Sequence, residues 1–281
     1  MGETTMAHID HAPRHEPLAR GPFATTHARF TEVDAFDWAA LGAEVEDAKV
    51  RDRGRRSFEL RALDEQRSLL AFTELLGELC EAGAPIDVIG SLTRVVRDEA
   101  LHVDLCDRVV KALGGWDDRA PEPRWVRSNK KLPLKRRILA TVLGSLCVGE
   151  TISVHMIKGV RAHASDATTH AVLTRMLADE SFHSRFGWWW LESMPLEGED
   201  AKWARAYLAR LLPSVAKSLA PMQAPKKKPH VYSPFGSMAP EERREAFDAA
   251  MHGTILPGFD RAGLEATAIW KRVVGGAEEA A

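Results

Sequence analysis

The five-residue stretch from Asp98 to His102 constrains this chain most, because it forms an Asp-Glu-x-x-His unit inside an apolar helical pattern. The same unit recurs from Asp179 to His183. A glutamate and a histidine three positions apart lie on one face of a helix, so their oxygen and nitrogen atoms can reach one metal ion together. Two such pairs predict two metal ions and a scaffold that brings the pairs together.

Apolar periodicity predicts four long helices, over about residues 53–80, 86–113, 134–163 and 167–194. Each helix carries a carboxylate in its apolar stripe, and two of them add a histidine. These residues are Glu65, Glu99 with His102, Glu150, and Glu180 with His183. Glu74, a competing candidate on the first helix, shares its face with other charged residues, so it is expected to be solvated.

The heights of these residues along the helices agree. In an antiparallel helix pair, two residues equally far from the connecting turn lie level, because each residue advances about 1.5 Å. Glu65 lies 18 residues before Gly83 and Glu99 lies 16 after it, which places them within about 3 Å of one level. Counting from the turn near residue 166 places Glu150 level with Glu180 in the same way. The four carboxylates are therefore predicted at one height.

Four carboxylates and two imidazoles in an apolar core require compensation, because isolated buried charge is very costly. Two divalent ions would supply four positive charges. Carboxylate oxygens with one imidazole per metal favour iron or manganese over structural zinc, which prefers a closed shell of nitrogen and sulfur ligands. Each histidine also needs a partner for its second ring nitrogen. Asp98 and Asp179 are the candidates, each reaching the histidine of the opposite helix.

In these residues the sequence resembles the ferritin-like di-iron carboxylate superfamily, in which two helices each give one Glu and two give Glu-x-x-His. The resemblance covers about residues 53–194. It implies an all-α fold, a ferritin-like antiparallel four-helix bundle with a long crossover between its second and third helices and extra C-terminal helices. The implied cofactor is two iron ions, with Mn/Fe as the alternative. The implied metal ligands are Glu65, Glu99, His102, Glu150, Glu180 and His183.

Within the superfamily, the resemblance points to a stand-alone di-iron oxidase or oxygenase. Cys106 stands where a ribonucleotide reductase small subunit has its radical tyrosine. The implied reaction uses O2 and an external electron donor to hydroxylate, N-oxygenate or desaturate a small organic substrate. Ser153, one turn after Glu150, is placed for proton delivery by this resemblance, and a helix-packing serine is an equal interpretation. Trp190 walls a substrate channel or, as the preferred interpretation, packs in the core.

Two other function classes remain open. One is a ferritin-type iron oxidation, storage or oxidative-stress protein that has no organic substrate. The other is a binding or structural protein with a vestigial site, and the six intact ligand residues speak against it. Metal content and the fate of O2 distinguish the three classes.

The chain is predicted to contain a flexible N-terminal arm over residues 1–33, the bundle over 34–195 and a C-terminal helical extension over 196–281. A short helix is expected around residues 34–48. Pro213 is expected to kink or end a helix, and the last helical region is expected to break at Pro257.

Composition limits the partners and the cellular location that can be expected for the protein. A net charge of -2 and a pI near 6.6 give no general reason to expect nucleic acid or an anionic membrane as partner. The absence of an apolar run near the roughly 20 residues that span a bilayer, and of a signal peptide, favours a cytoplasmic protein. The three cysteines show no Cys-x-x-Cys spacing, so neither a zinc ribbon nor a disulfide framework is expected. A homodimer is possible.

Overall fold

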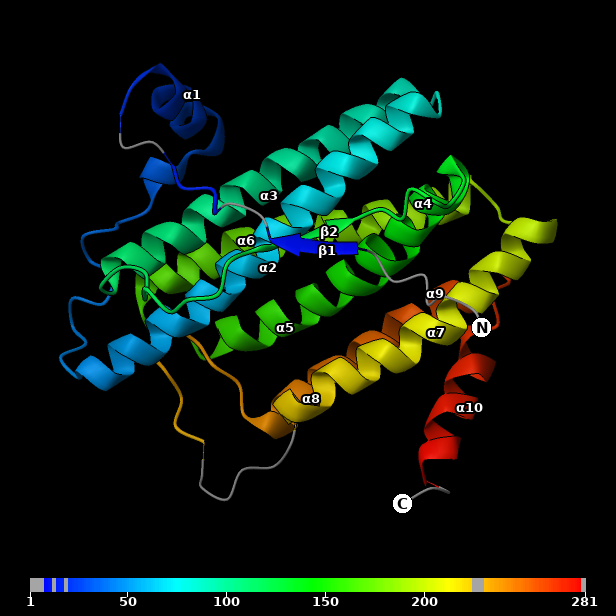
Figure 1. The fold of residues 1–281 in the computed structure, drawn as a ribbon. Helices are drawn as coiled ribbons and strands as arrows, with labels where there is room; N and C mark the ends of the chain where they lie inside the picture. The colour runs from blue at the N-terminus through cyan, green and yellow to red at the C-terminus, as the bar shows by residue number, and fades with distance from the viewer. Residues whose placement is uncertain (1–7, 12–13, 18–19, 224–229, 279–281) are drawn as a thin grey trace. The chain divides into compact units, whose positions relative to one another are not determined.

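A computed structural model describes residues 8–11, 14–17, 20–223 and 230–278, and the chain is mostly helical (Figure 1). The all-α class predicted from the sequence is therefore confirmed. The helices are α1 (Pro22–Thr31), α2 (Ala48–Glu81), α3 (Ile86–Ala112), α4 (Leu134–Thr141), α5 (Thr151–Ala162), α6 (Ala167–Ser193), α7 (Gly198–Gln223), α8 (Pro240–Ala250), α9 (Leu256–Arg261) and α10 (Ala266–Glu278). Three shorter or wider helical segments are η1 (Val33–Ala35), η2 (Val142–Glu150) and η3 (Met251–Ile255), and two short strands are β1 (His8–His11) and β2 (Arg124–Arg127).

The chain divides into two compact units. Unit 1 comprises the described residues up to Ile138, together with Val160–Asp179 and Tyr232–Ser237. Unit 2 comprises Leu139–Gly159 and the described residues of Glu180–Val231 and from Met238 onward. Three of these boundaries fall inside helices, within Leu134–Ala162 and within α6, and the others lie in the loop before α8. They do not test the domain boundaries predicted at residues 33 and 195, which remain a prediction.

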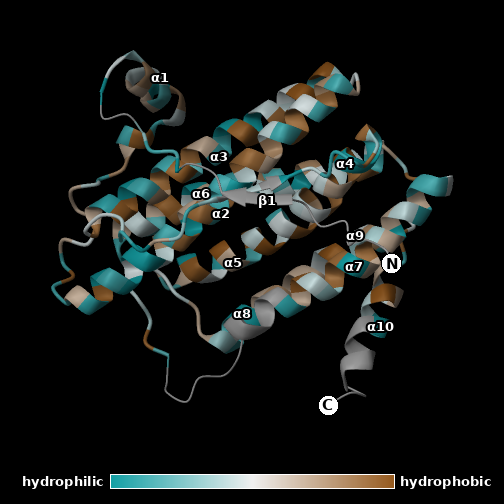
Figure 2. Cartoon of the chain, viewed as in Figure 1, coloured by the Kyte–Doolittle hydropathy of each residue, from teal (hydrophilic) through white to brown (hydrophobic). Residues whose placement is uncertain are grey.

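In unit 1, α2 and α3 run antiparallel side by side (Figure 1). The side chain of Asp47 caps α2 by accepting hydrogen bonds from the backbone N–H groups of Lys49 and Val50. Gly83 adopts a left-handed φ of 68° in the turn to α3, a conformation that glycine accepts without strain. Teal and brown residues alternate along both helices, as amphipathic helices require (Figure 2). The two helices predicted over 53–80 and 86–113 are thus present, the first beginning five residues earlier.

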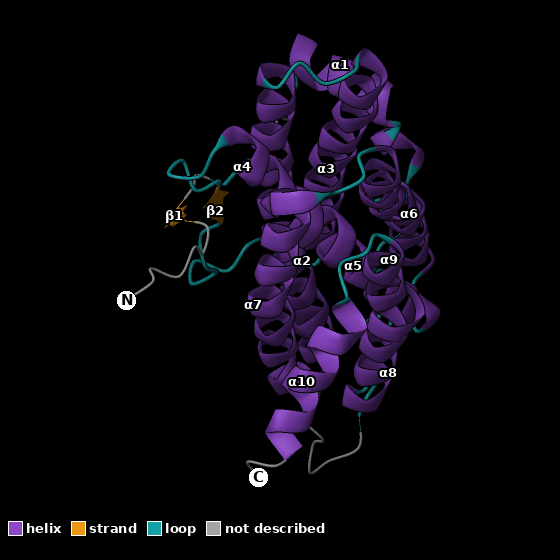
Figure 3. Ribbon diagram, turned by 90° about the vertical axis from the view of Figure 1, so that its right-hand side faces the viewer, coloured by secondary structure: helices purple, strands orange, loops and turns teal. Residues whose placement is uncertain are grey.

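The connection between α3 and α4 covers one face of α2. Its strand β2 pairs antiparallel with β1 (Figure 3), with Ile9 opposite Val126. Lys130 of this connection forms an ion pair with Glu74, at 2.5 Å, and another with Glu78. The expectation that Glu74 is solvated was therefore wrong. The charged residues on this face of α2 predict an exposed face. In the structure, a segment some 50 residues later in the chain covers this face and provides the positive charge that pairs with Glu74.

The N-terminal region is more structured than the sequence predicted, because its described residues include β1 and the helix α1. The prediction of a short helix around residues 34–48 was wrong. After η1 the chain forms turns, in which Gly42 has a left-handed φ of 70° and donates its N–H to Asp166. Leu41 is buried nevertheless, so the apolar contact was identified even though the helix was not.

In unit 2, two prolines lie inside helices, although Pro213 was expected to kink or end its helix and Pro257 to break one. Helix α7 continues past Pro213, and three of its side chains, Ala204, Leu208 and Leu212, are fully buried. Burial of two leucines contributes about 1.5 to 3 kcal/mol each, enough to offset the roughly 3 kcal/mol that an internal proline costs.

Pro257 also fails to break its helix, which continues to Arg261. The π-helical segment η3 ends two residues before Pro257, and its longer hydrogen-bond spacing accommodates a residue that has no N–H.

The continuous helix formed by α4, η2 and α5, over Leu134–Ala162, is long and apolar enough to cross a bilayer. The expectation that no such apolar run exists was therefore wrong. Half of its most apolar window is buried inside the protein, and a single helix of this kind is weak evidence for a membrane span. Cytoplasmic localisation stays a prediction.

Candidate metal centre

The first group of predicted ligands lies in unit 1, on α2 and α3. Glu65 is 5% exposed, and Glu99 and His102 are fully buried. Each offers a ligand atom, and these atoms lie within 4.8 Å of one another. His102 Nδ1 is 3.4 Å from Glu65 Oε2 and 3.9 Å from Glu99 Oε2. The helical spacing of Glu99 and His102 and the level of Glu65 across the turn thus bring three donors to one point, which we call the first triad.

The second ring nitrogen of His102 is held by Asp179 on α6. His102 Nε2 lies 3.4 Å from Asp179 Oδ2, the pairing expected from the sequence. Arg175, one turn earlier on α6, donates from Nε to the same oxygen at 2.7 Å. Because the carboxylate accepts from Nε2–H, Nδ1 is the ring nitrogen that faces Glu65 and Glu99, and it offers a lone pair to a metal ion when it carries no proton.

The electrostatics of the first triad favour a cation. Burial alone lowers the pKa of His102, but the adjacent carboxylates of Asp179 and Glu65 outweigh burial and raise the pKa well above its usual value. Burial likewise raises the pKa of Asp179, and its hydrogen bonds from His102 and Arg175 reverse this and leave the pKa lowered. The raised pKa of His102 reflects the negative charge of the carboxylates around it, and the same charge favours a bound cation.

Asp98, the other expected partner of a histidine, is fully buried on α3. In unit 1 it accepts from Arg97, Nη2 to Oδ1 at 2.9 Å, and from Arg94, Nε to Oδ2 at 3.2 Å. These arginines compensate its charge. Its pairing with a ligand histidine stays a prediction.

The second group of predicted ligands lies in unit 2. Glu150 is 4% exposed at the end of η2, and Glu180 and His183 are buried on α6. Their ligand atoms also lie within 4.8 Å of one another. His183 Nδ1 is 3.5 Å from Glu180 Oε2 and 3.9 Å from Glu150 Oε2. This second triad repeats the donor set of the first, again with Nδ1 turned to both carboxylates.

The helix that carries Glu150 is π-helical over Val142–Glu150, so Glu150 is the last residue of this segment. Such widened turns occur frequently at functional sites. Tyr207 of α7 fixes the beginning of this segment, because its hydroxyl donates to the carbonyl oxygen of Ala140 at 3.1 Å. A Cβ added to Gly144 would lie 2.7 Å from Tyr207 Oη, so only glycine admits the tyrosine at this distance.

Hydroxyl groups fix the other end of the π-helical segment. Thr151 Oγ1 lies 2.7 Å from Ser184 Oγ, and Trp188 Nε1 donates to Thr151 Oγ1 at 3.2 Å. Thr151 directly follows Glu150 and Ser184 directly follows His183, so this network joins the two helices of the second triad. These residues could not be predicted from the sequence, because an isolated serine or threonine in a helix does not change the periodic pattern of apolar residues.

Two further residues that the sequence analysis proposed for the site are only partly buried. Ser153, expected to deliver protons, is half-buried one turn after Glu150. Trp190, expected on the core stripe, is partly exposed. In unit 2 it is Trp188 that is fixed, by its hydrogen bond to Thr151 and by its ring contact with Phe259 at 5.1 Å between centroids.

Each triad can hold a metal ion, because two carboxylates and one imidazole converge at a buried point. The two negative charges match one divalent ion, and the oxygen-rich donor set suits iron or manganese better than a soft metal. No family model, no curated protein and no solved structure matches this chain. The function is therefore argued from the triads and their surroundings.

Proposed function

We propose that this protein is a non-haem di-iron oxidase or oxygenase of the ferritin-like four-helix type, which uses O2 to hydroxylate, N-oxygenate or desaturate a small organic substrate. The observation that supports it is the duplication of the buried triad. Glu65, Glu99 and His102 in unit 1 have the same chemistry and nearly the same internal distances as the triad of unit 2. A single structural metal site would need only one of them.

In this proposal the two triads form one dinuclear centre. The support comes from the covalent continuity of α6. Asp179 contacts His102 of the first triad, and the next residue along the chain is Glu180 of the second triad. Consecutive Cα atoms are about 3.8 Å apart, so a residue that binds the first triad is directly bonded to a ligand of the second.

The chain's own residues have distinct roles in the proposal. Glu65, Glu99, His102, Glu150, Glu180 and His183 hold the ions. When iron is bound, a reduced centre of this composition activates O2. Asp179 keeps the proton on Nε2 of His102, so that Nδ1 remains available as a ligand. The buried position of both triads excludes bulk water, and Ser153 is the proposed proton donor from the side of Glu150.

Two ions of iron are the proposed cofactor, with a mixed manganese and iron centre as the alternative. Both metals accept the same oxygen-rich ligand set. An external electron donor completes the reaction, because the sequence has no closely spaced cysteine pair that could carry an electron-transfer cluster.

Metal analysis of the full-length protein tests the proposal. We expect about two iron or manganese ions per chain after anaerobic loading, and a large loss in Glu99→Ala. Glu74→Ala is the matched control, because Glu74 is a glutamate of α2 that binds Lys130 instead of a triad. Fewer than about one ion per chain, with no difference between Glu99→Ala and the unchanged protein, would contradict the proposal.

The fate of O2 separates oxygenase chemistry from iron storage. After anaerobic loading and reduction, we expect O2 uptake that stops at a fixed ratio to iron and resumes only when reductant is added. Continuous uptake with added Fe(II), accompanied by a growing ferric mineral and assembly of a cage, would show a ferritin-type protein instead.

A further inference from the structure

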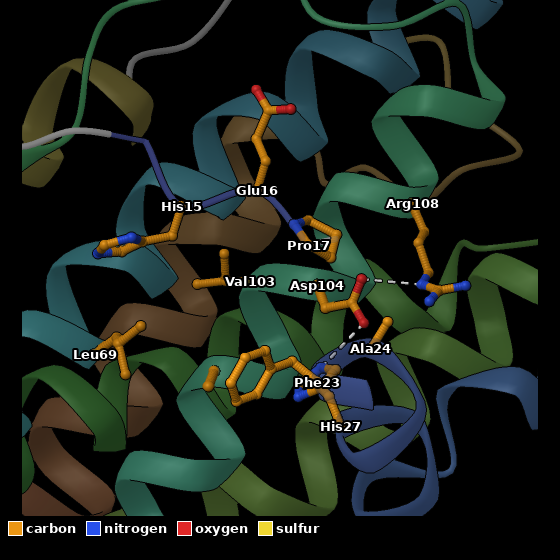
Figure 4. A pocket seen from close by; sticks show the side chains of 11 residues that line it. His15, Glu16, Pro17, Phe23, Ala24, His27, Leu69, Val103, Asp104 and Arg108 are labelled. Atoms are coloured by element: carbon orange, nitrogen blue, oxygen red, sulfur yellow. Dashed lines mark hydrogen bonds and ion pairs between the residues drawn. The ribbon is translucent and has the colours of Figure 1, made fainter. Parts of the chain in front are cut away.

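A cavity of about 220 Å³ lies in unit 1, where α1 and residues 15–17 face α2 and α3 (Figure 4). One side of it is apolar. Pro17 comes from the N-terminal segment, Phe23 from α1, Leu69 from α2 and Val103 from α3. Phe23 is 78% exposed on a short surface helix, so it does not pack in the core. A ligand in the cavity would give this side chain an apolar contact.

The other side of the cavity is polar and has a defined hydrogen-bond pattern. Asp104, only 3% exposed, accepts from His27 Nε2 at 3.2 Å and from Arg108 Nε at 2.9 Å (Figure 4). Each of its two oxygens thus has one partner, and the carboxylate is neutralised locally. Because Nε2 of His27 donates to Asp104, Nδ1 of the neutral ring is an acceptor. The His27 side chain is 35% exposed, so a ligand can reach it.

The size and charge of the cavity limit what it can bind. A protein cavity of about 150 Å³ accommodates benzene, whereas drug-sized ligands occupy about 300 Å³ or more. A volume of about 220 Å³ therefore suits one ring with a small substituent. The compensated Asp104 offers no unpaired charge to an ionic ligand. The carboxylate of Glu16, which also lines the cavity, is paired with Lys111 at 3.9 Å, so the lining favours a neutral ligand over an ionic one.

The cavity begins one helical turn from two ligands of the first triad. Leu69 follows Glu65 by four residues on α2, and Val103 follows Glu99 by four residues on α3. Four residues correspond to about 6 Å along a helix axis. A molecule in the cavity would therefore lie beside the helix turns that carry the first triad.

We infer that this cavity binds a compact neutral molecule of about one ring that carries a hydroxyl group, with the ring against Phe23, Leu69 and Val103 and the hydroxyl donating to Nδ1 of His27. The assignment of a ligand site rests on the cavity alone. The further statement that this ligand is the substrate rests on the proposed function.

Calorimetric titration of the metal-free, full-length protein with phenol, anisole and benzoate tests the inference. Phenol has the hydroxyl donor, anisole keeps the ring without the donor, and benzoate is an anion. We expect phenol to bind at least about threefold more tightly than anisole, as one hydrogen bond allows, and benzoate to bind most weakly. In His27→Ala the preference for phenol over anisole should disappear, whereas His170→Ala, at an exposed histidine outside the cavity, should keep it.

Two further variants test the cavity without changing His27. Ala24→Trp should fill the cavity from α1 and abolish phenol binding. Phe23→Ala should weaken phenol binding about threefold or more, and Phe30→Ala, an exposed phenylalanine of the same helix outside the cavity, should not. Equal binding of phenol and anisole, strongest binding of benzoate, absence of phenol binding, or unchanged binding by Ala24→Trp would each overturn the inference. Because the protein is metal-free, none of these results depends on the metal content that tests the proposed function.

Discussion

The two triads have the same donor set but different supports. The first lies on two regular helices and is held electrostatically, by Asp179 on His102 and by Arg175 on Asp179. The second is carried partly by the π-helical segment η2 and is held by hydroxyl contacts at both ends of that segment. This difference indicates that the first triad depends on charge, whereas the second depends on packing and on hydrogen bonds between neutral groups.

The largest expected effect comes from removing either histidine. His102→Ala and His183→Ala should each lower the metal content by about one ion per chain, and the double variant should retain almost none, because each triad contributes one imidazole. Inductively coupled plasma mass spectrometry measures this directly. His170→Ala provides the surface control. Full metal content in the double variant would show that the triads are not the metal sites.

The electrostatic support of the first triad is tested by Asp179→Asn. Asparagine keeps one acceptor oxygen, but it has no negative charge and its NH2 group can donate to an unprotonated ring nitrogen. The tautomer of His102 is then no longer fixed, and the affinity of the first triad should fall about 10- to 100-fold. Competition with a chelator of known affinity measures the change. Asp107→Asn is the matched control, because Asp107 is equally buried on α3 but binds Trp116 and Lys111. A similar loss in both variants would mean that any buried charge change disturbs the fold.

The contribution of Tyr207, at the start of η2, to the free energy of unfolding should decrease at alkaline pH. Burial raises the pKa of Tyr207 from 10.0 to about 12. The unfolded chain therefore loses this proton first, so stability is fully present below pH 10 and decreases by about 1.4 kcal/mol per pH unit up to about pH 12. Urea unfolding of the protein and of Tyr207→Phe across this range measures the difference. An identical slope in both proteins would mean that Tyr207 does not titrate in this way.

The smallest expected effect concerns the hydroxyl network at the other end of η2. Thr151→Val keeps the shape but leaves the hydroxyl of Ser184 and the N–H of Trp188 without Thr151 as partner, so unfolding should become easier by about 1 to 2 kcal/mol. Metal affinity of the first triad should not change. Thr174→Val, at an exposed position on α6, should have no measurable effect on urea unfolding. A weakened first triad in Thr151→Val would contradict the separation of the two supports.

The sequence alone determined the helices around the triads and the residues that form the triads. The 3.6-residue period survives any tertiary arrangement, so α2, α3 and α6 could be located within a few residues. The carboxylates of Glu65 and Glu150 could be selected because a charged residue in an apolar stripe is costly without a partner. Even the pairing of Asp179 with the histidine of another helix followed from position, since it precedes a glutamate of the second triad by one residue.

Only the tertiary structure decided the features that depend on contacts between distant segments. Glu74 is covered because the β2 connection brings Lys130 to it, and α7 tolerates Pro213 because its leucines are buried. The cavity under α1 exists because a helix that the sequence did not predict places Phe23 and His27 against α2 and α3. Local sequence records the preference of a segment for a conformation, whereas these outcomes are set by burial and counter-charges that residues far along the chain provide.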